Sequence, residues 1–85
     1  MIDIYKHIVN YLDNLVEELN SSNKINTANF FENISSQIRV ETPEYTIKEL
    51  LVQLNHSASI SQYANFTFKE DCLFDEVLKE VEKLL

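Results

Sequence analysis

Residues 2–19 read IDIYKHIVNYLDNLVEEL, and this stretch decides the fold of the chain. Its apolar residues recur every three or four positions, which is the spacing of residues on one face of a helix. Two neighbouring stripes result, the first made of Ile2, Tyr5, Val9, Leu12, Val16 and Leu19 and the second of Ile4, Ile8, Tyr11 and Leu15. So wide an apolar face predicts a helix that is either central in a bundle or shared with another subunit.

Two further segments have the same periodicity and begin at residues that favour helix starts. A helix is predicted over 27–40, with Asn26 or Thr27 as its N-cap, because short polar side chains accept hydrogen bonds from free helix amides. A last helix is predicted over 71–85, where Asp71 is the expected cap and an apolar stripe runs to the end of the chain.

The third helix of the chain is predicted from a capping sequence. Thr46-Ile47-Lys48-Glu49 has the pattern in which the threonine hydroxyl and the glutamate carboxylate each accept from the other residue's amide. Tyr45 and Leu50 are spaced as a hydrophobic staple across this start. The helix is expected to end near Asn55 or His56, so the prediction is an all-α bundle of four helices.

The segment between the last two helices, residues 57–69, gives the weakest pattern. Residues 57–61 favour a loop, 61–64 fit a single extra helical turn, and 65–68 alternate as a short extended piece would. Three aromatic side chains are expected to be buried here: Tyr63, Phe66 and Phe68.

The composition indicates one acidic domain over residues 1–85. Seven basic residues stand against fourteen acidic ones, and the net charge of −7 disfavours nucleic acid and anionic membranes as partners and favours a basic protein. The chain has no glycine, no apolar run long enough for a membrane span and no signal-peptide pattern at its start. A single cysteine, Cys72, fits a reducing cytoplasm.

No catalytic or ligand-binding motif stands out in the sequence. His7, His56 and Cys72 are too far apart to predict a metal site, and the absence of glycine excludes a phosphate-binding loop. Carboxylates near Cys72 oppose its activation as a nucleophile. We therefore expect a protein without cofactor or metal that is not an enzyme.

The polar face of the first helix is the best candidate for a functional surface. Asp13 and Glu17 are like charges four positions apart, and Glu17 and Glu18 lie near the helix end where the dipole disfavours acids. Local stability does not favour such a pattern, and no lysine follows until Lys24. The cations of a partner protein would pair with these carboxylates.

The chain resembles the small acidic helical immunity proteins that are encoded beside toxins in bacterial polymorphic and contact-dependent inhibition systems. The resemblance lies in layout and charge, and the corresponding segments are 2–19, Phe30-Phe31 within 27–40, Leu50-Leu51-Val52-Gln53-Leu54, 57–61 and 71–85. It implies stoichiometric neutralisation of a cognate nuclease-type toxin, whose basic groove an acidic inhibitor would cover. The implied partner-binding residues are Asn10, Asp13, Glu17 and Glu18, with Tyr11 or Tyr63 as aromatic anchors.

Two other functions are compatible with the same features. The wide apolar face of the first helix would also suit a homodimeric structural or regulatory module. An acidic chain of this size would also suit a phage-type inhibitor of restriction or CRISPR enzymes. All three are binding functions, and a toxin gene next to this one would favour the first.

Overall fold

Four α-helices and one short 3₁₀ helix make up the part of the chain that the computed structural model describes, residues 3–40, 43–57 and 64–85. They are η1 (Asp3–Tyr5), α1 (Lys6–Ser21), α2 (Ile25–Arg39), α3 (Glu44–His56) and α5 (Phe68–Leu84). These ranges contain no strand, so the predicted all-α class is confirmed. The Cα radius of gyration is 12.0 Å, which fits a bundle of this size.

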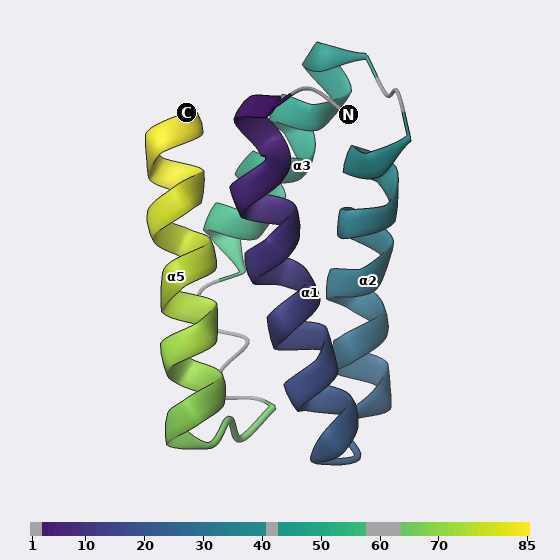
Figure 1. The fold of residues 1–85 in the computed structure, drawn as a ribbon, viewed down its shortest axis with the longest axis vertical. Helices are drawn as coiled ribbons and strands as arrows, with labels where there is room; N and C mark the ends of the chain where they lie inside the picture. Colours follow the sequence, from purple (N-terminus) through teal and green to yellow (C-terminus); the bar gives the residue numbers. More distant parts are fainter. Residues whose placement is uncertain (1–2, 41–42, 58–63) are drawn as a thin grey trace.

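The first helix, α1, is central in the bundle. It packs against α2 and α5, which lie on either side of it, and α3 covers the space between these helices (Figure 1). Its buried side chains come from both predicted stripes and are Ile8, Val9, Leu12, Leu15, Val16 and Leu19. Most of the wide apolar face is thus covered within the chain, while Ile4 is 55% exposed and Tyr11 is half-buried.

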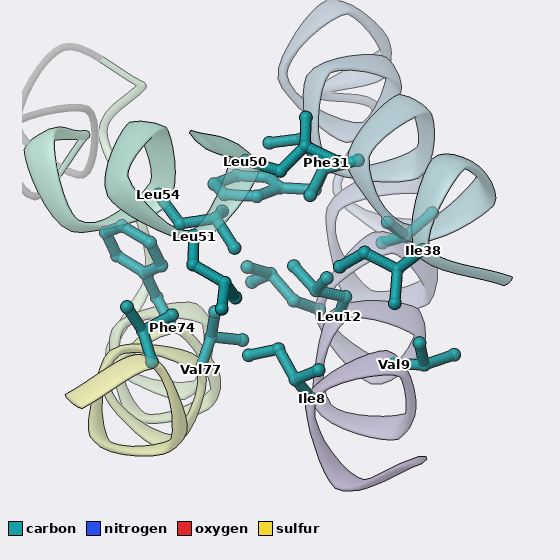
Figure 2. Packing of buried hydrophobic residues seen from close by; sticks show 14 of the residues in the cluster. Ile8, Val9, Leu12, Phe31, Ile38, Leu50, Leu51, Leu54, Phe74 and Val77 are labelled. Carbon is teal, nitrogen blue, oxygen red and sulfur yellow. The ribbon is translucent and has the colours of Figure 1, made fainter. Parts of the chain in front are cut away.

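The core forms where all four helices converge. Figure 2 shows Leu12 of α1, Phe31 of α2, Leu51 of α3 and Val77 of α5 directed into one apolar cluster. The Phe31 ring packs edge-on against Phe74, with 5.4 Å between the ring centroids. The order of the helices along the chain and their short connections place each apolar face toward this cluster.

The helix α2 begins two residues earlier than predicted. Its N-cap position is occupied by Lys24, whose side chain makes no capping hydrogen bond. The expected caps, Asn26 and Thr27, therefore lie in the first turn. The turn before α2 is tight because Asn23 adopts a left-handed conformation with φ of 62°, which asparagine tolerates better than most residues.

The predicted capping box of α3 does not form. The helix begins at Glu44 after Pro43, whose carbonyl accepts hydrogen bonds from the amides of Thr46 and Ile47 at 3.0 and 3.1 Å. Thr46 thus lies inside the helix, where its own amide already has a backbone partner. The predicted staple is also wrong, because Tyr45 is 71% exposed.

A capping box forms instead at the start of α5, where Asp71 was the predicted cap. The Glu70 amide donates to Thr67 Oγ1 at 3.2 Å, and the Thr67 amide donates to Glu70 Oε1 at 2.8 Å. The helix therefore begins at Phe68, three residues before the predicted start, and Asp71 lies in its first turn. The negative charge of Asp71 still interacts favourably with this helix end.

The segment before α5 is described only in part. The predicted loop at 57–61, the extra turn at 61–64 and Tyr63 lie wholly or largely outside the described residues. Asn65 is left-handed, with φ of 54°, and Phe66, which was expected to be buried, is partly buried against Phe74. Phe68, by contrast, is 85% exposed as the first residue of α5, so the expectation that it is buried was wrong.

Candidate protein-binding surface

The solvent face of α1 carries the predicted acidic residues, but only two of the three are paired with a cation. Glu17 is exposed and forms no ion pair within the described part of the chain. Asn10, Asn14 and Asn20 are exposed on the same helix, so Glu17 lies on a face rich in amide groups. Asp13 and Glu18 flank this face and are both paired with cations from other helices.

Asp13 connects α1 to α2. Its Oδ1 atom accepts a hydrogen bond of 2.8 Å from the Ser35 hydroxyl, and its Oδ2 atom pairs with the Arg39 guanidinium. Arg39 also lies 4.0 Å from the Glu32 carboxylate. The Ser35 side chain is fully buried, so Asp13 satisfies a hydroxyl that would otherwise lack a partner.

Glu18 connects α1 to α5 through an ion pair of 3.3 Å with Lys69. This pair and the Asp13–Arg39 pair correct the interpretation that no cation of the chain relieves the acids of α1. The partners come from residues 26 and 51 positions along the chain, where no local pattern could have indicated them. Tertiary structure therefore explains two of the three carboxylates.

Two surface grooves lie on either side of Glu17. The groove between α1 and α2 has a volume of about 510 Å³ and is lined by Asp13, Val16, Glu17, Asn20, Ser21, Glu32 and Arg39. The groove between α1 and α5 has a volume of about 250 Å³ and is lined by Asn14, Glu17, Glu18, Ser21, Lys69 and Leu73. Glu17 lines both grooves, so its carboxylate is at the centre of the surface.

The predicted aromatic anchors are not part of this surface. Tyr11 is half-buried and lines a different groove of about 350 Å³, together with residues of the second half of α5: Glu76, Lys79, Glu80, Glu82 and Lys83. Tyr63 lies outside the described residues. The structure therefore brings Asp13, Glu17 and Glu18 together and separates Tyr11 from them.

Most cations of the chain are used in internal ion pairs. Lys24, Arg39, Lys69, Lys79 and Lys83 each pair with a carboxylate. Within the described residues, the carboxylates that are exposed and lack an ion pair are Glu17, Glu44, Glu49, Asp71, Glu76 and Glu82. The surface thus presents negative charge that the chain itself does not neutralise.

Sequence reasoning missed a cluster of contacts around the buried Glu70 side chain at the start of α5. The Lys24 ammonium lies 2.5 Å from Glu70 Oε1 and 2.9 Å from the Asn65 carbonyl oxygen, and 5.8 Å above the centre of the Phe66 ring. We call Lys24, Asn65, Phe66, Thr67 and Glu70 the Lys24 cluster. The pattern Thr67-Phe68-Lys69-Glu70 was the signal in the sequence, since it has the spacing of a capping box.

The Glu70 carboxyl is fully buried and remains a better acid than usual. Burial by itself raises the pKa of Glu70, because a charged group loses its hydration. Hydrogen bonds from Lys24, Ser22 and the Thr67 amide favour the carboxylate, and with the Lys24 charge they bring the pKa below its ordinary value. The cluster is therefore a structural ion pair that joins the α1–α2 turn to the start of α5.

No described helix is long and apolar enough to cross a bilayer. Among the described residues, no three His, Cys, Asp or Glu side chains lie together in an arrangement that could hold a metal ion. Comparison of the chain with protein-family models, with curated proteins and with solved structures gives no match.

Proposed function

We propose that this chain is a non-enzymatic inhibitor that binds a basic protein, of the kind that gives a bacterium immunity to a neighbouring nuclease-type toxin. The observation that carries the proposal is the position of Glu17, a carboxylate between two grooves that has no ion pair among the described residues, in a chain of net charge −7. A basic nucleic-acid groove offers cations that would complete this surface. Inhibition would be stoichiometric, because the inhibitor would occupy the groove that the nucleic acid needs.

The ion pairs beside Glu17 support such a role. Asp13–Arg39 and Glu18–Lys69 attach α1 to both neighbouring helices, so the face between them is held on a rigid frame. A preorganised surface loses less conformational freedom on binding than a mobile one does. The surplus negative charge would steer the encounter with a basic partner and accelerate association. We place this action in the cytoplasm, where a toxin of this class meets nucleic acid.

The packing of α1 favours a heterologous partner over the homodimeric alternative. Six residues from the two apolar stripes are buried in α1, which packs against α2 and α5, so most of the feature that suggested a dimer is used within one chain. Two copies would also bring together surfaces of the same negative sign, which opposes association.

The test uses the C-terminal domain encoded by the adjacent gene, produced with an inactivating active-site substitution. Wild-type protein should form a one-to-one complex with this domain and should block the nuclease activity of the active form at equimolar concentration. Absence of a complex at micromolar concentration, or of inhibition in the presence of a complex, would refute the proposal.

The contribution of the surface is measured with charge reversals at single positions. Glu17→Lys should lower the association rate about tenfold at low salt, since steering charges act mainly on that rate. Glu49→Lys is the matched control, because Glu49 is an exposed carboxylate on α3 that also lacks an ion pair. Equal effects from the two variants would attribute steering to net charge and not to the α1 face. Asp13 and Glu18 are unsuitable positions, because their substitution would break internal pairs.

A further inference from the structure

An exposed aromatic side chain lies at one end of the bundle. Phe68 is 85% exposed, the largest exposed fraction among the large apolar residues described. It is the first residue of α5, at the end of the molecule where α1 finishes and α2 also begins (Figure 1). Ile25, the first residue of α2, is 47% exposed at the same end. Two apolar side chains therefore face solvent where three helices meet.

The Lys24 cluster holds both of these residues in place. Ile25 directly follows Lys24, and Phe68 directly follows Thr67, whose hydroxyl caps α5. The Lys24 ammonium bonds to the Asn65 carbonyl and to Glu70, so it joins the turn before α2 to the segment before α5. The backbone on both sides is thus fixed by a partly buried ion pair, and Phe68 is presented from a rigid position.

Nothing within the fold requires an aromatic residue at position 68. The capping box uses the hydroxyl of Thr67 and the carboxylate of Glu70, and the aromatic contact with the core is made by Phe66. An exposed Phe adds nothing to these contacts and leaves a large apolar surface in water. Rigid aromatic side chains on a fixed backbone are typical anchors of protein interfaces, because they lose little conformational freedom on binding.

The charges around Phe68 indicate what kind of partner would cover it. Lys69, the next residue along the chain, and Lys24, which bonds to the segment before α5, are paired with Glu18 and Glu70. Asp71, one turn along α5 from Phe68, and Glu17, in the groove that Lys69 lines, are exposed and have no ion pair in the part of the chain that the structure describes. An apolar anchor with unpaired carboxylates at its edge suits an apolar socket with Lys or Arg at its rim. A second copy of this chain carries the same net charge of −7, which opposes association of two copies.

We propose that Phe68 is the hydrophobic anchor of the partner interface and that it inserts into an apolar socket rimmed by cations on a basic protein. This inference rests on the proposed inhibitory function. It adds to the proposed interface an apolar contact that lies outside the acidic face of α1. Glu17 would accelerate the encounter, and Phe68 would slow dissociation. Tyr11, in the groove beside the second half of α5, has no part in this interface.

The experiment measures binding of three variants to the inactivated C-terminal domain of the adjacent gene product. Phe68→Ala should raise the Kd about 10- to 100-fold, mainly through faster dissociation, as expected for an anchor at an interface. Tyr45→Ala is the matched control: Tyr45 is an aromatic residue 71% exposed on α3, which begins at the opposite end of the bundle (Figure 1). It should change the Kd less than twofold. Glu17→Lys should reduce the association rate and its salt dependence, which Phe68→Ala should leave unchanged.

The outcomes separate this inference from the proposed function. Tight wild-type binding that Phe68→Ala leaves within twofold would overturn the anchor and leave the inhibitor function standing. Equal losses from Phe68→Ala and Tyr45→Ala would also overturn it, because the effect would then not be specific to this end. No wild-type binding would overturn both. Far-ultraviolet circular dichroism of Phe68→Ala confirms that the exposed substitution leaves the helices intact.

Discussion

Two stretches of this chain have the same capping sequence and behave differently. Thr46-Ile47-Lys48-Glu49 lies inside the first turns of α3 and makes no capping box, whereas Thr67-Phe68-Lys69-Glu70 forms one at the start of α5. The four-residue patterns differ only at their second position. The residues around each pattern therefore decide whether it is used.

The context of the two stretches explains the difference. Before the first stretch, Pro43 has a φ of −54° and its carbonyl accepts from two helix amides, so α3 begins before Thr46 is reached. Before the second, Asn65 is left-handed and no proline precedes the threonine, so the helix begins after Thr67. The second stretch also meets Lys24, which stabilises the Glu70 carboxylate in its buried position. A capping sequence sets the start of a helix when the residues before it do not already form a helical turn.

The largest expected effect comes from removing the cation of the Lys24 cluster. Lys24→Met should destabilise the protein by about 3 kcal/mol, because it leaves the Glu70 carboxylate buried without a counter-charge. The free energy of unfolding is measured by urea denaturation at pH 7. Lys48→Met on α3 serves as control, since Lys48 is exposed and forms no ion pair among the described residues, and should change stability by less than about 0.5 kcal/mol.

A double variant tests whether Lys24 and Glu70 are energetically coupled. Adding Glu70→Leu to Lys24→Met removes the buried charge and should restore part of the lost stability, because an apolar pair replaces an uncompensated carboxylate. Additive losses from the two substitutions would mean that Lys24 and Glu70 are not energetically coupled.

The next effect is the pH dependence of protein stability to which Glu70, in the second stretch, contributes. The pKa of Glu70 lies below its ordinary value of 4.5 in the folded protein, so its contribution to stability is complete above that value. The contribution is lost as the pH falls through the lower pKa of the folded state. Between pH 5 and pH 3, the free energy of unfolding should therefore fall more steeply for wild-type protein than for Glu70→Gln. Glu49→Gln, in the first stretch, is the matched control for the loss of one carboxylate. Parallel curves for wild-type protein and Glu70→Gln would show that the folded state does not favour this carboxylate.

A smaller effect compares the two threonines directly. Thr67→Ala should cost about 1 kcal/mol through loss of the cap, and Thr46→Ala should cost less than about 0.5 kcal/mol or be slightly stabilising, because alanine is the better helix former. Thermal unfolding of the two variants under the same conditions measures the difference. A larger loss for Thr46→Ala would place the start of α3 at Thr46 after all.

The smallest effects are expected at the aromatic residues beside each stretch. Tyr45→Ala and Phe68→Ala should each change the free energy of unfolding by less than about 0.5 kcal/mol, because both side chains are mostly in solvent. Chemical denaturation measures both. A loss of unfolding free energy above about 1 kcal/mol for Tyr45→Ala would indicate that Tyr45 does pack against Leu50 as a hydrophobic staple. A loss of that size for Phe68→Ala would indicate that the Phe68 ring stabilises the fold.

The number and approximate positions of the helices could be predicted from the sequence, because apolar periodicity reports the buried face of each helix. The wide apolar face of the first helix is compatible both with a central position in a bundle and with a dimer interface. The sequence alone therefore did not predict which of the two α1 adopts. Helix starts were less predictable, as Thr67 and Pro43 show. Their boundaries depend on which backbone amides find partners, and the partner of Glu70 is Lys24, 46 residues away.

The sequence did not indicate that the acidic residues of the candidate surface differ in their pairing, with Asp13 and Glu18 on either side of an unpaired Glu17 within the described residues. Asp13 and Glu18 looked unpaired because Arg39 and Lys69 are distant in sequence, and only the packing of α2 and α5 against α1 brings them near. The exposure of Phe68 was equally hidden, since an alternating aromatic pattern normally indicates burial. Its first-turn position in α5 turns it away from the core.

The two left-handed asparagines have a consequence for the unfolded chain. Asn23 and Asn65 occupy conformations that glycine adopts without steric strain, and the chain contains no glycine. An asparagine backbone has less freedom before folding than a glycine backbone, so less entropy is lost when each turn forms. Both turns flank the contacts of Lys24, which join residues more than forty positions apart. The glycine-free sequence thus lowers the entropic cost of closing that long loop by restricting the chain before it has folded.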